Sequence, residues 1–191
     1  MQELKERIRK EGKVLPGNII KIDGFLNHRV DVGLMRAIAK EFVRRIDTTG
    51  VTAVLTVEAS GIPLGTVTAE ELGVPLVFAK KAKSDNIEGG LLRSEIYSYT
   101  YKKHVTLLVS GQWLTAEDKV LIVDDFLANG EALSGLVDIV NQAGAELIGM
   151  GVAVEKGFQG GGAKLRKMGV PLESLAIIES ADEKNGIIFR D

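Results

Sequence analysis

The sequence predicts an α/β protein built on a central, mostly parallel, twisted sheet with helices on its faces. Two observations lead to this prediction. Short apolar and β-branched runs alternate with segments of helical periodicity, which is typical of parallel strands joined by crossover helices. In addition, the run Val120–Val123 has no polar member, as expected of a strand buried on both faces. Right-handed crossovers would then place the carboxyl ends of the strands on one edge of the sheet.

The first eighty residues predict three helices and the first strands. Leu4 and Ile8 lie one helical turn apart, and Gly12 ends that helix. A short extended piece over residues 19–22 leads through a glycine-containing turn to Asp31, which caps a helix that runs to about Ile46. The order strand 51–57, helix 63–72, strand 76–79 then gives the alternation expected of a parallel sheet.

The middle of the chain predicts a loop and a hairpin. Residues 80–90, KKAKSDNIEGG, are polar and have paired glycines, so we expect a mobile loop. The segments 94–100 and 104–110 alternate in polarity, as in an antiparallel hairpin that projects from the sheet. Trp113 is expected to be a packing anchor where the chain returns to the core.

The last third predicts a helix after the run at 120–123, marked by apolar residues at helical spacing and ended by Gly144. A buried strand at 147–154, a flexible GFQGGG loop and a short helix at 163–168 follow. The segments 175–178 and 187–189 are expected to pair over residues 19–28.

Bulk properties exclude several classes of function. The 191 residues are 45% hydrophobic, enough for one compact domain that buries roughly two thirds of its unfolded surface. A net charge of -2 gives no basic field for nucleic acid, and no apolar run reaches the roughly 18 residues of a membrane span. Without cysteine or an apolar leader, a cytoplasmic location is expected, and two histidines make a zinc site improbable.

The most informative segment is VLIVDDFLANGEA, residues 120–132. Asp124 and Asp125 fall at the carboxyl end of a predicted buried strand, the edge at which open α/β sheets bind ligands. The small residues that follow form a turn whose backbone N–H groups face the start of a helix, which suits a phosphate. Carboxylates for ribose hydroxyls and amides for phosphate together indicate a sugar-phosphate site. Adjacent aspartates also occur as turn formers and helix caps, but here the strand, turn and helix signals support one another.

This segment resembles the phosphoribosyl pyrophosphate (PRPP) signature of the type I purine phosphoribosyltransferase family, and the resemblance extends over the whole chain. It implies a single domain over residues 1–191, with a core at about 31–178 and a small hood made of residues 1–30 and 179–191. It also implies that Asp124 and Asp125 are catalytic, contacting the ribose hydroxyls and opposing the positive charge that grows on the ring. The PRPP 5'-phosphate would lie in the turn of Ala128, Asn129, Gly130, Glu131 and Ala132, with Glu131 in a backbone role only, because its carboxylate would repel the phosphate.

The turn Glu58–Gly61 also ends a predicted strand and opens a helix, although such turns are ordinary connections. The resemblance makes it the pyrophosphate-binding loop, through Ala59 and Ser60, and implies that Lys81 reaches pyrophosphate when the mobile loop closes. Mg²⁺ is the expected cofactor; it prefers oxygen ligands and would be bound mainly by PRPP and pyrophosphate, so no protein metal ligand is predicted.

Lys156 follows the strand 147–154 on the ligand edge, where it could donate to a purine oxygen while Phe158 lends a stacking face. The resemblance adds Ile20 against the ring and Asn27 at a polar edge, although the residues alone would make Ile20 a core residue and Asn27 a turn residue. Asn27 offers both a donor and an acceptor, which suits the alternating carbonyl and N–H groups of xanthine.

The resemblance thus implies transfer of phosphoribose from PRPP to N9 of xanthine in purine salvage, with PRPP and xanthine as small-molecule partners and a homodimer as the assembly. The alternatives are guanine, hypoxanthine or adenine as the base, and a regulator that only senses PRPP. Such regulators carry a DNA-binding domain, and the segment before Ile19 is too short for one. A P-loop nucleotidase is excluded because no GxxxxGK[ST] occurs.

Overall fold

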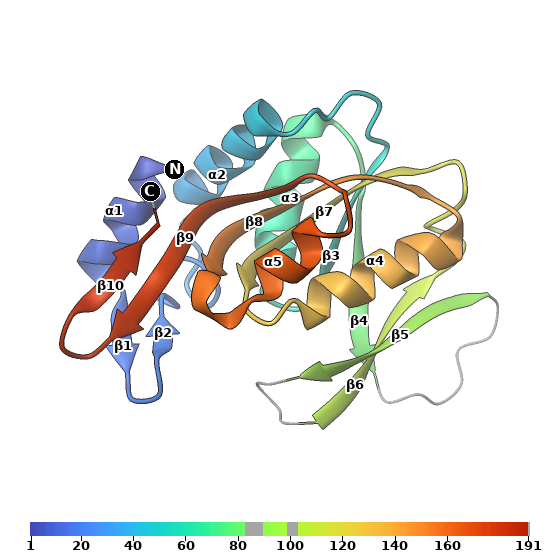
Figure 1. Cartoon of the computed structure of the whole chain (residues 1–191). Coiled ribbons are helices and arrows are strands. Elements are labelled where there is room, and N and C mark those ends of the chain that lie inside the picture. The colour runs from blue at the N-terminus through green and yellow to red at the C-terminus, as the bar shows by residue number, and fades with distance from the viewer. Residues whose placement is uncertain (83–89, 99–102, 191) are drawn as a thin grey trace.

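The computed structural model describes residues 1–82, 90–98 and 103–190, and it confirms the predicted α/β class. Most of its strands form one eight-stranded sheet, drawn in Figure 1. These strands are β3 (Ala53–Val57), β4 (Leu76–Ala82), β5 (Leu91–Ser98), β6 (Lys103–Ser110), β7 (Lys119–Leu127), β8 (Glu146–Lys156), β9 (Leu172–Asp182) and β10 (Gly186–Phe189).

The centre of this sheet is parallel and its edges are antiparallel. The spatial order is β10-β9-β8-β7-β3-β4-β6-β5, and β4, β3, β7, β8 and β9 pair in parallel. The strand order reverses around β7 and β3, so the topological switch point lies beside the carboxyl ends of these two strands. Open α/β sheets bind ligands at such a point, which is where Asp124 and Asp125 lie.

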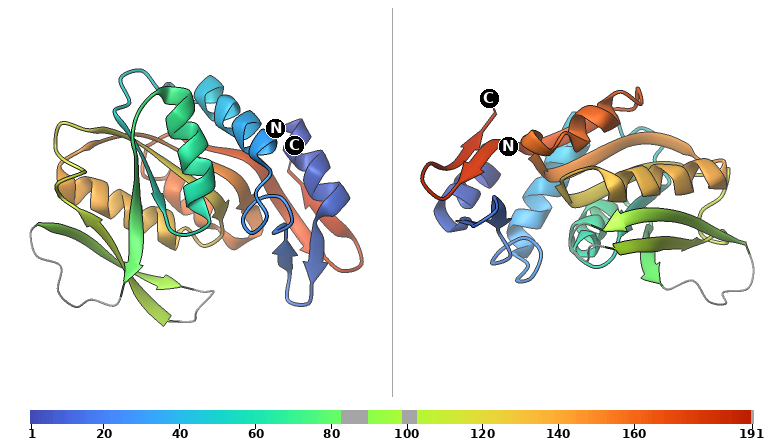
Figure 2. Two further views of the ribbon diagram at one scale, coloured as in Figure 1. Left: turned by 180° about the vertical axis from the view of Figure 1, so that it is seen from behind. Right: turned by 60° about the horizontal axis from the view of Figure 1, so that its bottom comes forward.

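Helices cover both faces of the sheet. On one face, α2 (Val32–Arg45) packs against α3 (Gly61–Leu72), and on the other lie α4 (Glu131–Ala143) and the short α5 (Gly161–Arg166), as the two views of Figure 2 show. Each face buries its own hydrophobic cluster. The predicted helix ends are confirmed: the Asp31 carboxylate accepts a hydrogen bond from Leu34 N at 3.1 Å, and Gly144 ends α4 with φ at 72°.

A smaller layer lies at one end of the sheet. There α1 (Gln2–Glu11) and the two-stranded β1 (Lys13–Leu15) and β2 (Ile19–Lys21) lie next to β9 and β10, and both termini are at this end (Figure 1). Lys5 Nζ donates to Arg190 O at 2.8 Å, which links the first helix to the last residues described. The antiparallel pairing of β9 with β10 confirms the predicted terminal pair, whereas the division into hood and core stays a prediction.

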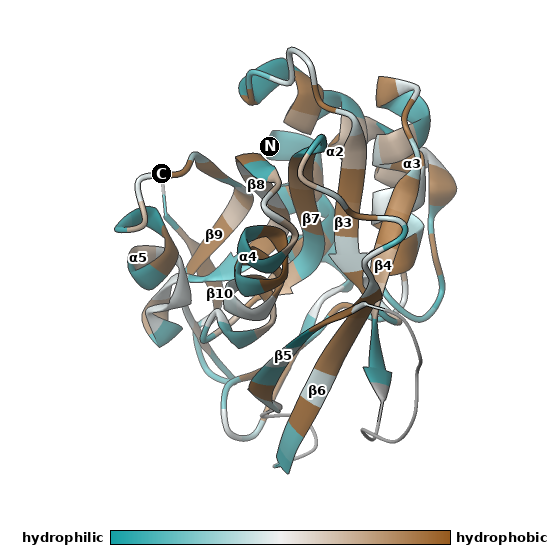
Figure 3. Cartoon of the chain, turned by 90° about the vertical axis from the view of Figure 1, so that its right-hand side faces the viewer, coloured by the Kyte–Doolittle hydropathy of each residue, from teal (hydrophilic) through white to brown (hydrophobic). Residues whose placement is uncertain are grey.

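The predicted antiparallel hairpin is confirmed as β5 and β6, which project from the sheet and carry apolar residues along much of their length (Figure 3). The predicted mobile loop at residues 80–90 begins too early: β4 runs on to Ala82, because Lys80–Ala82 pair with β6, and residues 83–89 lie outside the described part. Among the described residues, no helix has both the length and the apolar character to cross a membrane.

Two further predictions are wrong. Trp113 is no packing anchor: it is 71% exposed, in a turn after β6 whose backbone is closed by a hydrogen bond from Trp113 N to Ser110 O. The GFQGGG segment is no loop either, because it forms a 3-10 helix, η1 (Gly157–Gln159), and then the start of α5. Gly161 and Gly162 are needed for close packing, and Gly160 has a left-handed φ of 77° that favours glycine.

Candidate active site

Asp124 and Asp125 form the centre of the site. The strand β7 extends to Leu127, so both acids lie within the strand and not after it as predicted. Each is only 3% exposed, and Asp125 N donates to Asp124 Oδ1 at 3.0 Å. Burial raises the pKa of Asp124 well above its usual range, the Asp125 charge raises it further, and the Lys81 charge opposes the shift. The pair is therefore poised to gain from a ligand that brings hydroxyl donors and positive charge.

Asp125 connects three segments that are distant in the sequence. Ser60 Oγ, at the end of β3, donates to Asp125 Oδ1 at 2.9 Å, and Asn27 Nδ2 donates to Asp125 Oδ2 at 2.9 Å. The structure thus brings together one residue from each predicted subsite: Asp125 for ribose, Ser60 for pyrophosphate and Asn27 for the base. Residues predicted for three different subsites therefore contact one another directly.

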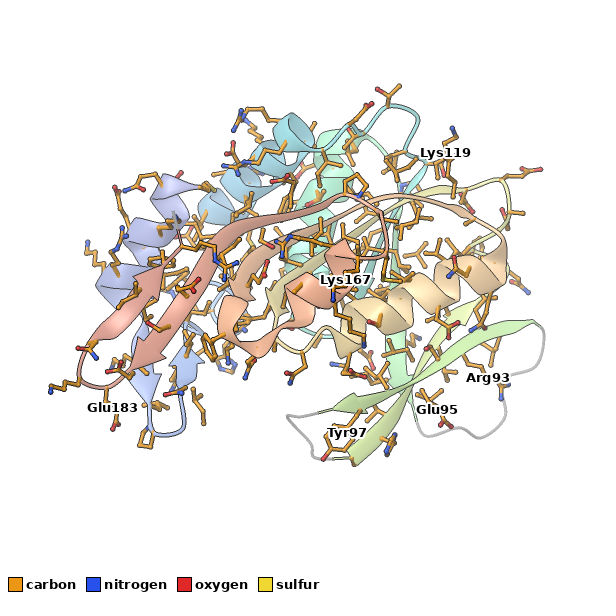
Figure 4. The ribbon with its side chains drawn as sticks, viewed as in Figure 1. Arg93, Glu95, Tyr97, Lys119, Lys167 and Glu183 are labelled. Carbon is orange, nitrogen blue, oxygen red and sulfur yellow. The ribbon has the colours of Figure 1, made fainter. Side chains whose placement is uncertain are left out.

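The predicted phosphate turn lines a cavity of about 160 Å³. Gly130 has φ at 83°, a left-handed conformation that favours glycine, and it immediately precedes α4. Glu131 also lines the cavity, and its Oε1 pairs with Lys164 Nζ at 3.5 Å. Its backbone-only role stays a prediction. Lys81 of β4 and Tyr97 of β5 line the same cavity, and Figure 4 labels Tyr97. The remaining lining residues are Ile96, Phe126, Leu127, Ala128, Asn129, Ala132 and Leu133.

The second turn, Glu58–Gly61, lies between β3 and α3 next to the acids. The Glu58–Ala59 peptide bond is cis, and Glu58 Oε1 accepts a hydrogen bond from Lys81 N. A Cβ on Gly61 would lie 2.1 Å from Thr56 Oγ1 and 2.9 Å from Asp124 Oδ1, so only glycine allows this approach. The turn is held both to the acids and to the backbone of Lys81.

For the base, Lys156 ends β8, and Phe158 lies exposed in η1 directly after it. Lys156 Nζ lies 5.2 Å from the centre of the Phe126 ring, and burial lowers the pKa of Lys156. Ile20 is buried in β2 within the hydrophobic cluster, as the residues alone suggested, and its role toward the base stays a prediction. Sequence reasoning missed Phe126, although its place directly after the acids was a signal.

The described residues contain no group of three or more His, Cys, Asp or Glu side chains arranged to hold a metal ion. Asp124 and Asp125 offer oxygen ligands in one place, which fits a hard cation such as Mg²⁺ that brings most of its ligands with a phosphorylated substrate.

This fold and site define a class of enzyme. A family model, the phosphoribosyl transferase domain, matches residues 27–182, and the chain belongs to this family of pentosyltransferases. The resemblance expected from the PRPP signature is thereby confirmed.

Particular relatives narrow the comparison. Xanthine phosphoribosyltransferase of Lachnoclostridium phytofermentans is 50% identical over 191 residues, covering 100% of this chain and 98% of that protein. Its namesake in Bifidobacterium animalis subsp. lactis is 49% identical over 189 residues, with 98% of each covered. Among solved structures, APRTase from Giardia lamblia complexed with 9-deazaadenine has a TM-score of 0.76 at 25% identity, covering 91% of this chain and 96% of that chain.

Proposed function

We propose that this enzyme transfers the 5-phosphoribosyl group from PRPP to N9 of xanthine, giving xanthosine 5'-monophosphate and pyrophosphate. The observation that carries the proposal is the meeting of Asn27, Ser60 and Asp125 at the carboxyl ends of β3 and β7. Near-full-length similarity to proteins named xanthine phosphoribosyltransferase supports xanthine as the base.

In the proposed reaction the bond from C1' to the pyrophosphate oxygen breaks, its electron pair leaves with pyrophosphate, and N9 bonds to C1' and releases its proton. Asp124 and Asp125 accept hydrogen bonds from the ribose hydroxyls and oppose the positive charge that grows on the ring. Amides of the turn 128–132 hold the 5'-phosphate, while Ala59 and Ser60 contact pyrophosphate. Lys156 donates to a purine oxygen, Phe158 stacks on the ring, and Ile20 and Asn27 cover its other edge. Preorganised charges of this kind are usually the largest catalytic contribution.

The cofactor proposed is Mg²⁺, held mainly by PRPP and pyrophosphate. When bound it would neutralise charge on the leaving group. Asp124 and Asp125 would act on the ribose hydroxyls, and we propose no direct protein ligand to the metal.

The proposal is tested by incubating the purified protein with PRPP, Mg²⁺ and each of xanthine, guanine, hypoxanthine and adenine, and measuring nucleotide formation. We expect kcat/KM to be highest with xanthine, because a site built to bond polar groups of one base rejects analogues that lack them. Equal rates with guanine would overturn the choice of base but not the reaction. Binding of PRPP without any turnover would instead favour the sensing regulator.

Replacing Lys81 by Met should raise KM for PRPP by roughly tenfold or more while KM for xanthine changes little, because Lys81 lines the phosphate cavity and lies away from the base segment. The change keeps most of the length of the side chain and removes its charge and its N–H donors. Initial-rate kinetics with each substrate varied in turn would measure both constants. Lys40→Met is the matched control, since Lys40 is an exposed lysine of α2 that lines neither this cavity nor the site. An equal rise in both KM values would remove Lys81 from PRPP binding.

We also propose that the enzyme works as a homodimer in the cytoplasm. Phe78 and Trp113 are exposed and line one apolar groove on the outer part of the sheet, together with Leu76, Leu91 and Val109. A monomer rarely exposes such a patch without a partner.

Trp113→Glu should therefore convert the dimer to a monomer, because a buried unpaired carboxylate strongly disfavours an apolar interface. Light scattering behind size-exclusion chromatography would measure the mass, with the exposed Phe158→Glu as control. A Trp113→Glu protein that stays dimeric would place the interface elsewhere.

A further inference from the structure

We propose that Glu155 and Arg166 are positioning residues for purine recognition, which fix Lys156 without contacting the substrate. This rests on the proposed function, in which the base lies beside Lys156. Neither residue was predicted from the sequence to take part in the site.

Glu155 is an almost completely buried carboxylate whose hydrogen bonds come from α5 and β9. It is 2% exposed, Arg166 Nη1 donates to its Oε1 at 3.0 Å, and Arg166 Nη2 donates to its Oε2 at 2.6 Å. Ser174 Oγ on β9 donates to the same Oε2 at 2.5 Å. Burial by itself would raise the pKa of Glu155, but the hydrogen bonds from Arg166 and Ser174 lower it overall. The carboxylate is therefore a fully bonded junction between β8, α5 and β9.

This junction lies one residue before Lys156. Successive side chains of a strand point to opposite faces, so fixing Glu155 on the α5 face also fixes the direction in which Lys156 leaves β8. Within the described part of the chain the Lys156 side chain makes no hydrogen bond or ion pair, and its Nζ lies 5.2 Å from the centre of the Phe126 ring. The hydrogen bonds that hold this base-binding segment in place are thus those of Glu155, on the face of β8 opposite to Lys156.

The helix α5 lies directly on the junction. A Cβ on Gly162 would be 2.0 Å from Glu155 Oε1 and 2.5 Å from Arg166 Nη1. The backbone of α5 therefore lies so close to this ion pair that only glycine fits here. In Figure 4, Lys167 marks the end of α5, whose ribbon lies in front of the sheet. The first residue of α5 is also held by a bond outside the junction, since Gly161 N donates to Ala128 O at 3.2 Å. Loosening Arg166 should consequently move the base segment and spare the phosphate turn.

A buried ion pair is a poor device for stability, because an apolar replacement of similar volume is often as stable. Positioning explains it better: two parallel N–H···O bonds set distance and orientation together, which an apolar contact cannot do.

The test is a double-mutant cycle between Arg166→Met and Lys156→Met. In the wild-type background, Arg166→Met should raise KM for the base by roughly tenfold or more, and KM for PRPP should stay within about twofold. In the Lys156→Met background the same change should raise KM for the base by no more than about twofold, because the group being positioned is gone. Equal effects in both backgrounds would overturn the proposal.

Arg44→Met, which breaks an exposed ion pair with Glu41 on α2, is the control and should leave both KM values unchanged. If Arg166→Met does not fold, Arg166→Lys replaces it in the cycle, since it keeps the charge and loses the paired geometry. The cycle is run with the purine that the wild type turns over fastest. A different preferred base would then contradict the proposed substrate and leave the positioning role standing, whereas additivity would contradict the positioning role alone.

Discussion

Asp124→Asn and Asp125→Asn should each lower kcat by at least about a hundredfold while leaving the protein folded, the range seen when one preorganised electrostatic contact is removed from an active site. Each substitution removes a negative charge that opposes the positive charge growing on the ribose ring. Asn also accepts fewer hydrogen bonds than a carboxylate, so the contacts with the ribose hydroxyls are weakened. Single-turnover measurements with saturating PRPP would isolate the chemical step.

The two variants should differ in stability. Burial and the neighbouring charge raise the pKa of Asp124, so its ionised form destabilises the folded state once the pH rises above the pKa of the unfolded chain. Asp124→Asn removes that destabilisation and can still accept the bond from Asp125 N. Its free energy of unfolding at pH 7 should be equal to or above that of the wild type. Asp125→Asn should lose stability instead, because a neutral amide replaces the carboxylate that accepts charge-assisted hydrogen bonds from both Ser60 and Asn27.

Denaturant titration would measure both differences, and Asp138→Asn, on the surface of α4, is a suitable control for loss of one carboxylate. Turnover within about tenfold of the wild type in either variant would remove that acid from the proposed mechanism.

Where the sequence carried a local signal, the prediction from it held. The apolar run 120–123 predicted a buried strand, Asp31 predicted a helix N-cap, and Gly144 predicted a left-handed helix end. Each feature is found where it was expected. The sheet edge that gathers Ser60 and Asp125 also follows, because right-handed crossovers leave no other place for the strand ends. Their roles toward PRPP remain predictions.

The sequence could not predict which distant residues contact a given side chain, because tertiary packing decides those contacts. Glu155 is one charged residue among many until β9 and α5 enclose it. Trp113 is a large aromatic residue of a type often found in cores, but it lies in an exposed turn after β6. The GFQGGG segment has the composition of a loop. In the structure, however, Gly161 packs against the backbone of the turn 128–132, and Gly162 packs against the Glu155 carboxylate. Composition indicates the local preference of a segment. The environments of Glu155, Trp113 and the GFQGGG segment depend instead on residues that are distant in the sequence.

Gly161→Ala should raise KM for PRPP by roughly a hundredfold, since misplacing a binding group by about 1 Å has effects of this size. A Cβ at this position would lie 2.3 Å from Ala128 O and 2.6 Å from Gly130 N. Both are backbone atoms of the turn that we assign to the 5'-phosphate, so no side-chain rotation can relieve the overlap. The turn itself has to move, and the amides that would hold the phosphate move with it.

Gly33→Ala is the matched control, because its nearest neighbour, Asp31 Oδ1, would be at an ordinary 3.4 Å and the residue lies in α2 away from the site. It should leave KM for PRPP unchanged and raise the melting temperature slightly, as alanine favours a helix. The affinity for ribose 5-phosphate, measured by calorimetry, should fall with KM in Gly161→Ala, since this ligand fills only the phosphate and ribose subsites. A folded Gly161→Ala protein that binds ribose 5-phosphate as tightly as the wild type would mean that the phosphate lies elsewhere than in the turn 128–132.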